Sequence, residues 1–185
     1  MIPARPAVKS FTFPDGHISF SYPASWSVRT QRGPGLEGPP LQPVEAIVSD
    51  GTGADLFRVS SGADGIGCTA GPTHRTVLDA TAVPGMREVD GTTPLFGFIV
   101  EQSSGQDQYA MAVMSPRNLQ EGDVGSHCTL LIMGNGGALN QVIFLDQPVY
   151  PDPRSAFTSR QAAKEWMVTE EYAQLKALMI SLEYS

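Results

Sequence analysis

The sequence has no long hydrophobic run, little lysine and no cluster of positive charge. Its apolar runs extend over only a few residues, whereas a membrane-spanning helix needs about 20, so we expect no transmembrane segment. Lysine and arginine number 12 against 19 aspartates and glutamates, and the basic residues are scattered singly. A net charge of −7 without a basic patch repels nucleic acid and anionic lipid, which makes nucleic acid an improbable partner.

The first residues, Met1 to Pro6, lack the apolar segment that a signal peptide carries. The low charge, together with the many Ser, Thr, Gln and Gly residues, is nevertheless more typical of exported proteins than of cytosolic ones. We therefore expect an extracytoplasmic protein whose export signal is absent from this sequence. A cytoplasmic location is the alternative.

Cysteine is scarce, since only Cys68 and Cys128 are present. An even number of cysteines fits one structural disulfide in an exported protein. Two buried free thiols are the alternative. The separation in sequence does not decide between them, because a disulfide depends on the distance between the two Cα atoms.

The composition is that of one globular domain over residues 1–185. The chain is 41% hydrophobic and contains 19 Gly and 15 Pro, which is enough apolar material for a core and too little Gly and Pro for a low-complexity chain. Residues 1–9 are expected to form an extended or flexible N-terminal segment. No repeat with a fixed period is visible.

Alternating apolar residues and turn residues predict several β-hairpins. Ile18, Phe20 and Tyr22 alternate with serines after a turn at residues 14–16. Residues 10–13 lead through this turn into 18–22, and the predicted hairpins join residues 18–22 with 26–29, 44–49 with 56–61, and 96–101 with 109–114. Residues 76–83 are expected to be extended.

Two later strands have apolar residues at consecutive positions, over 128–133 and 142–145. This pattern is typical of strands covered on both faces, so we place them in the middle of the sheet. Helices are predicted over 160–167 and from Thr169 onward, where Tyr172, Leu175, Met179 and Leu182 form one apolar stripe. The fold class is α+β, with one curved, mainly antiparallel sheet of about six to eight strands packed against helices, two of them C-terminal.

The motifs that carry chemistry are incomplete. Residues 134–139 resemble a dinucleotide fingerprint without its third glycine. Residues 50–55 lack the alternating ligands of a calcium loop, so a plain hairpin turn is favoured for residues 50–55. Cys68, His74, His127 and Cys128 have the atoms but not the spacing of a zinc site. His17, His74 and His127 are candidate bases, but solvated loop positions explain His17 and His74 and are favoured. We predict no catalytic, cofactor-binding or metal-binding residue and no cofactor.

Two tryptophans could line a ligand groove. Trp26 alternates with Val28, however, and Trp166 lies on an amphipathic helix. Both positions favour a role as core anchors.

Residues 13–28, FPDGHISFSYPASWSV, resemble the opening of the PsbP-like superfamily, and residues 171–182 resemble the terminal helix and "SL" close of that superfamily. Between these ends the match is only to the order of elements. Within the superfamily the chain is similar to actinobacterial exported lipoproteins of the LpqN kind, although no lipobox cysteine lies near Met1. The resemblance implies a curved antiparallel sheet packed between helices. It also implies a binding or assembly role, because members of this fold are mostly accessory proteins.

Three functional hypotheses follow. The first is a non-enzymatic, exported accessory module that recognises a protein or cell-envelope component. The second is a cytosolic adaptor or secretion chaperone that masks an apolar segment of a partner. The third is a hydrolase with an unrecognised site, in which a histidine lies within hydrogen-bond reach of a Ser or Cys side chain.

Overall fold

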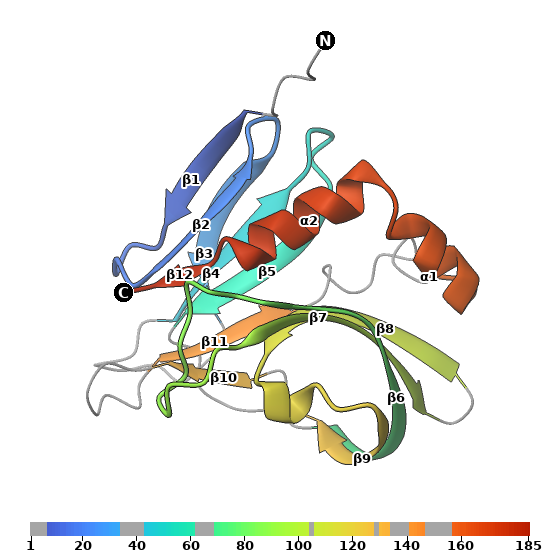
Figure 1. The fold of residues 1–185 in the computed structure, drawn as a ribbon. Coiled ribbons are helices and arrows are strands. Elements are labelled where there is room, and N and C mark those ends of the chain that lie inside the picture. The colour runs from blue at the N-terminus through green and yellow to red at the C-terminus, as the bar shows by residue number, and fades with distance from the viewer. Residues whose placement is uncertain are drawn as a thin grey trace.

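The fold comes from a computed structural model, which describes residues 7–33, 43–61, 69–103, 106–127, 130–133, 141–146 and 157–185. Antiparallel strands form three sheets, and two helices lie near the C-terminus (Figure 1). The predicted combination of antiparallel strands and C-terminal helices is confirmed. The prediction of one curved sheet is wrong, because the strands divide into sheets of three, five and four strands.

The three-stranded sheet has the order β1-β2-β12 and contains both ends of the described chain. Its strands are β1 (Val8–Thr12), β2 (Ile18–Pro23) and β12 (Glu183–Tyr184). The predicted turn at residues 14–16 is confirmed by a bond from the Gly16 N–H to the Phe13 carbonyl, and it joins β1 and β2 in a hairpin in which Phe11 pairs with Phe20. Because β1 begins at Val8, the end of the segment 1–9 is a paired strand.

The five-stranded sheet has the order β10-β11-β5-β4-β3. It comprises β3 (Ser27–Arg32), β4 (Val44–Ser49), β5 (Asp55–Ser61), β10 (Leu130–Met133) and β11 (Gln141–Asp146). The β4–β5 hairpin is confirmed.

Two predictions about this sheet are wrong. β3 pairs with β4, not with β2, so the chain changes sheet at Pro23. β10 is an edge strand in the described part of the sheet, whereas β11 lies between β10 and β5. An apolar pattern specifies which faces of a strand are buried but not which strand lies beside it.

The four-stranded sheet has the order β8-β7-β6-β9 and curves strongly (Figure 1). Its strands are β6 (Thr69–Ala82), β7 (Leu95–Ser103), β8 (Gln106–Met114) and β9 (Gly122–His127). The β7–β8 hairpin is confirmed. Residues 76–83 are extended as predicted, but β6 begins seven residues earlier, at Thr69.

Both helices begin where their capping residues predict. α1 (Arg160–Trp166) follows Ser159, whose Oγ accepts a hydrogen bond from the Ala162 N–H. α2 (Glu170–Ile180) follows Thr169, whose Oγ1 accepts one from the Tyr172 N–H. These bonds satisfy amide groups that have no partner within the helix. None of the described helices is long and apolar enough to cross a membrane.

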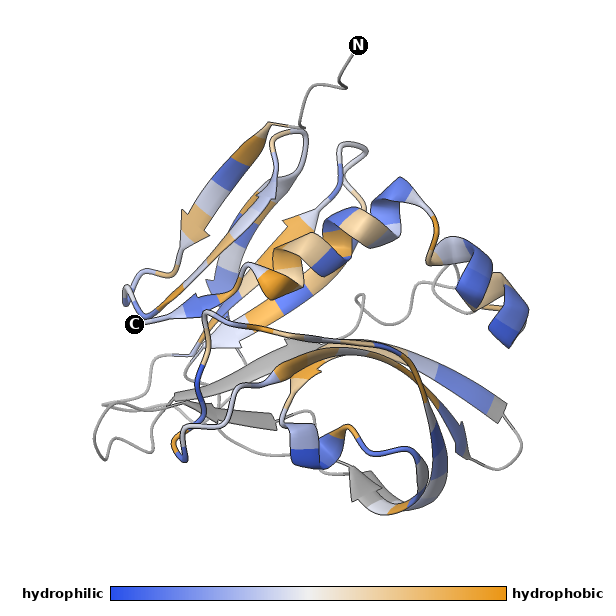
Figure 2. Cartoon of the chain, in the orientation of Figure 1, coloured by the Kyte–Doolittle hydropathy of each residue, from blue (hydrophilic) through white to orange (hydrophobic). Residues whose placement is uncertain are grey.

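One large hydrophobic core lies where α2 meets the sheets. The apolar stripe of α2 is buried as predicted, and α2 contacts β2 and β7 (Figure 2). The largest fully buried side chains of this core come from all three sheets and from their connections: Phe13, Phe20, Phe57, Phe96, Phe98, Ile18 and Met86. Burying each such side chain stabilises the fold by about 1.5–3 kcal/mol, so α2 and the sheets stabilise one another.

A smaller core lies on the opposite face of β6, β7 and β8, beneath the 3-10 turn η1 (Pro116–Asn118). Leu119 packs so closely that a Cβ added at Gly97 would lie 2.6 Å from its Cδ1 atom. Beside this core the Arg75 guanidinium donates to the Glu101 carboxylate and to the Asn118 carbonyl. Both charged side chains are buried, and each is satisfied by the other.

A charged contact holds α2 against β6. The register of β6 shifts between Val77 and Asp79, so that Asp79 pairs with Phe98. One oxygen of Asp79 accepts hydrogen bonds from the Tyr172 hydroxyl and the Lys176 ammonium, each at 2.5 Å. Burial by itself would raise the pKa of Asp79, but the hydrogen bonds from Lys176 and Tyr172 outweigh it and lower this pKa.

Replacing Asp79 with Asn is expected to lower the free energy of unfolding at pH 7 by about 2 kcal/mol, because a hydrogen-bonded buried charge is lost. Urea unfolding measures this loss. The matched control is Asp123→Asn, since Asp123 pairs with His74 but its side chain is 89% exposed. The control should change stability by less than about 0.5 kcal/mol. Equal losses in the two variants would contradict the role of Asp79.

Candidate functional site

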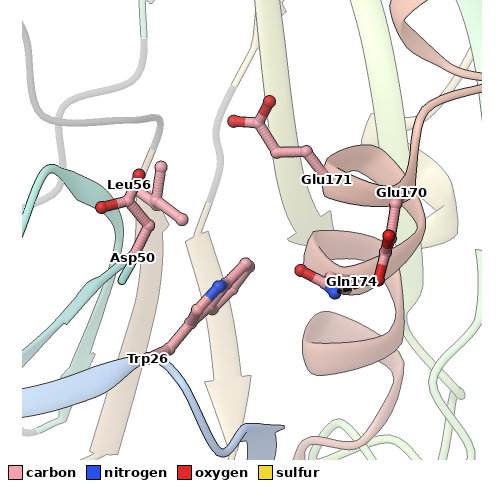
Figure 3. Close-up of a pocket in the computed structure, with 6 residues that line it drawn as sticks. All are labelled: Trp26, Asp50, Leu56, Glu170, Glu171 and Gln174. Atoms are coloured by element: carbon pink, nitrogen blue, oxygen red, sulfur yellow. Dashed lines mark hydrogen bonds between the residues drawn. The ribbon is translucent and has the colours of Figure 1, made fainter. Parts of the chain in front are cut away.

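A cleft of about 370 Å³ opens between the start of β3, the β4–β5 turn and the first turns of α2 (Figure 3). Strand pairing brings the first two walls together, since Ser27 pairs with Ser49, and the third wall is added because α2 packs across the sheets. The residues that line the cleft are Trp26, Asp50, Leu56, Glu170, Glu171 and Gln174.

Trp26 lies deepest in this cleft. Its main-chain N–H donates to the Pro23 carbonyl at 2.9 Å in the turn that leads from β2 to β3. The side chain is 6% exposed and belongs to the large core, which confirms Trp26 as a core anchor. Its indole projects between the β4–β5 turn and α2 (Figure 3). The indole nitrogen has no hydrogen-bond partner among the described residues, and it is not one of their buried polar atoms left without a partner, so it is open to the cleft.

The β4–β5 turn supplies the first carboxylate, that of Asp50. Its Oδ1 accepts from the Thr52 N–H at 2.8 Å, the Thr52 hydroxyl at 2.7 Å and the Ala54 N–H at 2.9 Å. The Thr52 hydroxyl contributes most to lowering the pKa of Asp50 below its usual value. Asp50 is therefore ionised at neutral pH, and its Oδ2 has no partner in the described part of the chain. The hairpin interpretation of residues 50–55 is confirmed.

The first turn of α2 supplies two more carboxylates. Glu171 accepts a hydrogen bond from the Trp166 indole at 3.3 Å, and Glu170 accepts one from the Gln174 amide at 2.9 Å. Each glutamate uses one oxygen in this way, and the other has no partner within the described ranges. Figure 3 shows the Glu171 carboxylate extending toward the wall that carries Asp50. Acidic residues are stable here because they interact with the positive end of the helix dipole.

The turn that carries Asp50 is fixed to the sheet by a second aspartate. Arg29 donates two hydrogen bonds of 2.5 Å to the oxygens of Asp55, and the Ser49 hydroxyl donates a third at 2.7 Å. The bond from Arg29 is the main cause that lowers the pKa of Asp55 to about 2. A bidentate pair of this kind has little freedom to rotate, so it holds the outer wall of the cleft in place.

Taken together, the cleft combines an aromatic and aliphatic floor, one N–H donor and three carboxylates. In the ranges that the structure describes, no three His, Cys, Asp or Glu side chains lie close enough to hold a metal ion.

The predicted histidine bases lie elsewhere. The His17 ring stacks on Tyr184, and its Nδ1 is 2.7 Å from the Ser185 carbonyl oxygen. His74 is in β6, not in a loop, and pairs with Asp123 on the exposed surface at 2.9 Å. Within the described residues, neither ring forms a hydrogen bond with a Ser or Cys side chain. His127 is in β9, but its side chain, like residues 134–139, lies outside the described residues.

The sequence predicts separate roles for most of the cleft residues. It predicts an anchor or a groove residue at Trp26 and a turn at Asp50. It also predicts that Glu170 and Glu171 are acids at the start of a helix. No sequence signal joins them, because residue 26 and residue 171 meet only through tertiary packing. Leu56 and Gln174 carried no signal of their own.

The Asp55 contact predicts a pH-dependent loss of stability. Its folded pKa of about 2 lies below the unfolded value of 3.8, so its contribution is complete above about pH 5 and disappears as pH falls toward 2. After allowance for solvent screening, Asp55→Asn should lower the free energy of unfolding by about 1 kcal/mol at pH 7. Urea unfolding at pH 7 and pH 2.5 measures the difference, which should fall to about a third of its pH 7 value at the lower pH. A difference that stays constant with pH would contradict this explanation.

The two cysteines lie outside the described residues, but their chain neighbours are partners in one ladder, since Thr69 pairs with His127 across β6 and β9. Cys68 directly precedes Thr69 in the chain, and Cys128 directly follows His127. We therefore predict a Cys68–Cys128 disulfide. Thiol titration of protein unfolded without reductant should detect no free thiol, and reduction should release two. Two thiols before reduction would contradict the disulfide.

Comparison of the chain with protein-family models, with curated proteins and with solved structures finds no match. The resemblance to the PsbP-like superfamily therefore stays a prediction carried by residues 13–28 and 171–182. The function has to be inferred from the geometry of the cleft.

Proposed function

We propose that this chain is a non-enzymatic accessory module that recognises a protein or cell-envelope component, and that the cleft at Trp26 is its binding site. An extracytoplasmic location and a kinship with LpqN-like exported proteins belong to the same proposal. The observation that carries it is the Trp26 indole, whose residue is anchored in the core at 6% exposure while its N–H borders an open cleft and has no partner among the described residues. A ligand acceptor can bond to this donor.

The walls of the cleft are already in place without a ligand. Trp26 is anchored in the core, the β4–β5 turn is held by Arg29 and Asp55, and α2 is held by its buried stripe and by Asp79. A site whose parts are ordered in advance binds with a smaller loss of conformational entropy. This arrangement supports recognition by a preformed surface.

The alternative of masking an apolar segment has less support. Among the described residues, the large hydrophobic side chains that are exposed are Val8, Val89 and Val168. They lie on β1, on the connection before β7 and between the two helices, so they do not form one patch. A docking surface for an apolar segment requires a contiguous apolar area.

The proposed function predicts that a peptide ligand will change the fluorescence of Trp26. Trp166→Phe leaves Trp26 as the single tryptophan, since the chain has two. Peptides selected from a random displayed library against the immobilised protein are titrated into this variant. Binding should shift the Trp26 emission, because the ligand changes the surroundings of the indole N–H.

A blocked cleft provides the control for this experiment. Gln174→Tyr places a bulky side chain on the cleft wall and should weaken binding by about tenfold or more. Gln161→Tyr, a matched change on the exposed surface of α1, should have no effect. Selection without any binder, or binders that leave Trp26 emission unchanged and tolerate Gln174→Tyr, would contradict the proposal.

A further inference from the structure

The free edge of the three-stranded sheet is a second surface, and it plays no part in the proposed function. β1 pairs with β2 on one side only, and Figure 1 shows its other side at the border of the fold. All of its residues except Phe11 are exposed. An open strand edge presents main-chain donors and acceptors to any further strand.

The hydrogen bonds at the two ends of the β1–β2 hairpin indicate which main-chain groups of β1 are free. The Ala24 N–H donates to the Ala7 carbonyl, and the Phe13 N–H donates to the Ile18 carbonyl, at 2.8 Å each. Opposed residues of an antiparallel pair alternate between bonded and non-bonded, so the odd-numbered residues of β1 bond to β2. The residues whose N–H and C=O groups point away from β2 are Val8, Ser10 and Thr12. These groups have no partner in the described part of the chain.

The side chains along this edge are mostly uncharged. Val8 is 68% exposed, and Ser10 and Thr12 are exposed on the same face of the strand. On the other face Phe11 is only partly buried, although its ring centroid lies 5.3 Å from that of Phe20. A strand laid along β1 would cover Val8 and Phe11 together with the open row of main-chain groups.

The other strand edges of the described chain are less suited to pairing. β3 carries Arg29 and Arg32, and charged side chains on an edge oppose the addition of a strand. β12 is already bonded on its outer side, from the Tyr184 N–H to the Gly85 carbonyl. β8 contacts β11, β9 joins its sheet through an irregular ladder, and β10 has only four residues.

A second copy of the chain fits this edge because β1 is complementary to itself. When Ser10 lies opposite Ser10 of the second copy in an antiparallel pair, Val8 lies opposite Thr12. The outward residues then exchange about six main-chain hydrogen bonds. On the other face Lys9 lies opposite Phe11, where an ammonium group beside an aromatic ring is favourable.

The single charge of β1 also selects this register. If the axis moved to Lys9, the two lysine ammonium groups would be directly opposed, which is destabilising. With Ser10 on the axis, no like charges face each other.

We propose that β1 is a dimer interface, in which two copies of the chain pair β1 with β1 antiparallel about a two-fold axis at Ser10 and join their three-stranded sheets into one continuous sheet. A contact of this kind uses the same surface on both copies, so it closes as a dimer and does not grow into a fibre. Two copies that each have a net charge of −7 repel one another, so the association strengthens as salt screens the repulsion.

Sedimentation velocity of the chain measures this association. Between loading concentrations of about 1 µM and about 500 µM, the wild type should change from monomer toward dimer, and raised salt should favour the dimer. Ser10→Lys places two ammonium groups across the axis and should weaken the association about fivefold or more. Thr30→Lys makes the same change at an exposed position of β3 and should leave the association unchanged.

Cysteine substitution tests the register. In the proposed dimer, Ser10→Cys places two thiols in one opposed pair whose Cα atoms are about 5.5 Å apart, which a disulfide can bridge. Mild oxidation should therefore produce a covalent dimer on a non-reducing gel. Val8→Cys is the matched control, because the two copies of Val8 lie about 13 Å apart along the strands. Val8→Cys should form no more covalent dimer than the wild type.

The outcomes separate the parts of the proposal. A wild-type chain that remains monomeric at about 500 µM would overturn a second copy as the occupant of this edge. Loss of association in Thr30→Lys, or an unchanged association in Ser10→Lys, would overturn the assignment to β1. Equal crosslinking of Val8→Cys and Ser10→Cys would overturn the register. Ligand binding at Trp26 is measured separately and does not depend on these results.

Discussion

The packing of α2 across the sheets is the interaction on which the rest of the structure depends. Its buried side chains Tyr172, Leu175, Leu178 and Met179 face the large core. Its C-terminal end leads directly into β12, which completes the three-stranded sheet. Its N-terminal turn provides two of the three carboxylates of the cleft. A displacement of this helix would therefore alter the core, the β2–β12 pairing and the cleft at once.

Polar contacts determine where α2 lies along the sheets, because hydrophobic packing alone is not directional. Near its middle, Tyr172 and Lys176 meet Asp79 at the bulge of β6. At its C-terminal end, the Ser181 hydroxyl accepts from the Ser21 N–H at 2.8 Å and donates to the Leu178 carbonyl at 2.7 Å. These bonds fix the helix at two points and so fix the position of Glu170 and Glu171 relative to Trp26.

Local features of the fold could be predicted from the sequence, whereas the partners of distant strands could not. The hairpins β1–β2, β4–β5 and β7–β8 follow from short turns between alternating segments, and the helix starts follow from Ser159 and Thr169. The pairings β6–β9, β5–β11 and β2–β12 join distant segments. Alternation does not encode them, and the same limitation explains why β3 was assigned to β2 and why β10 was placed in the middle of the sheet.

The sequence by itself determined the class of fold, the negative charge, the burial of Trp26 and the acidic start of α2, because each depends on residue type or on neighbours a few positions away. Only the tertiary structure decided that Trp26, Asp50 and Glu171 border one cleft, and that the indole N–H opens into it with no partner among the described residues. Cleft geometry depends on contacts between segments separated by more than a hundred residues. Such contacts arise from the packing of the whole core and leave no local pattern in the chain.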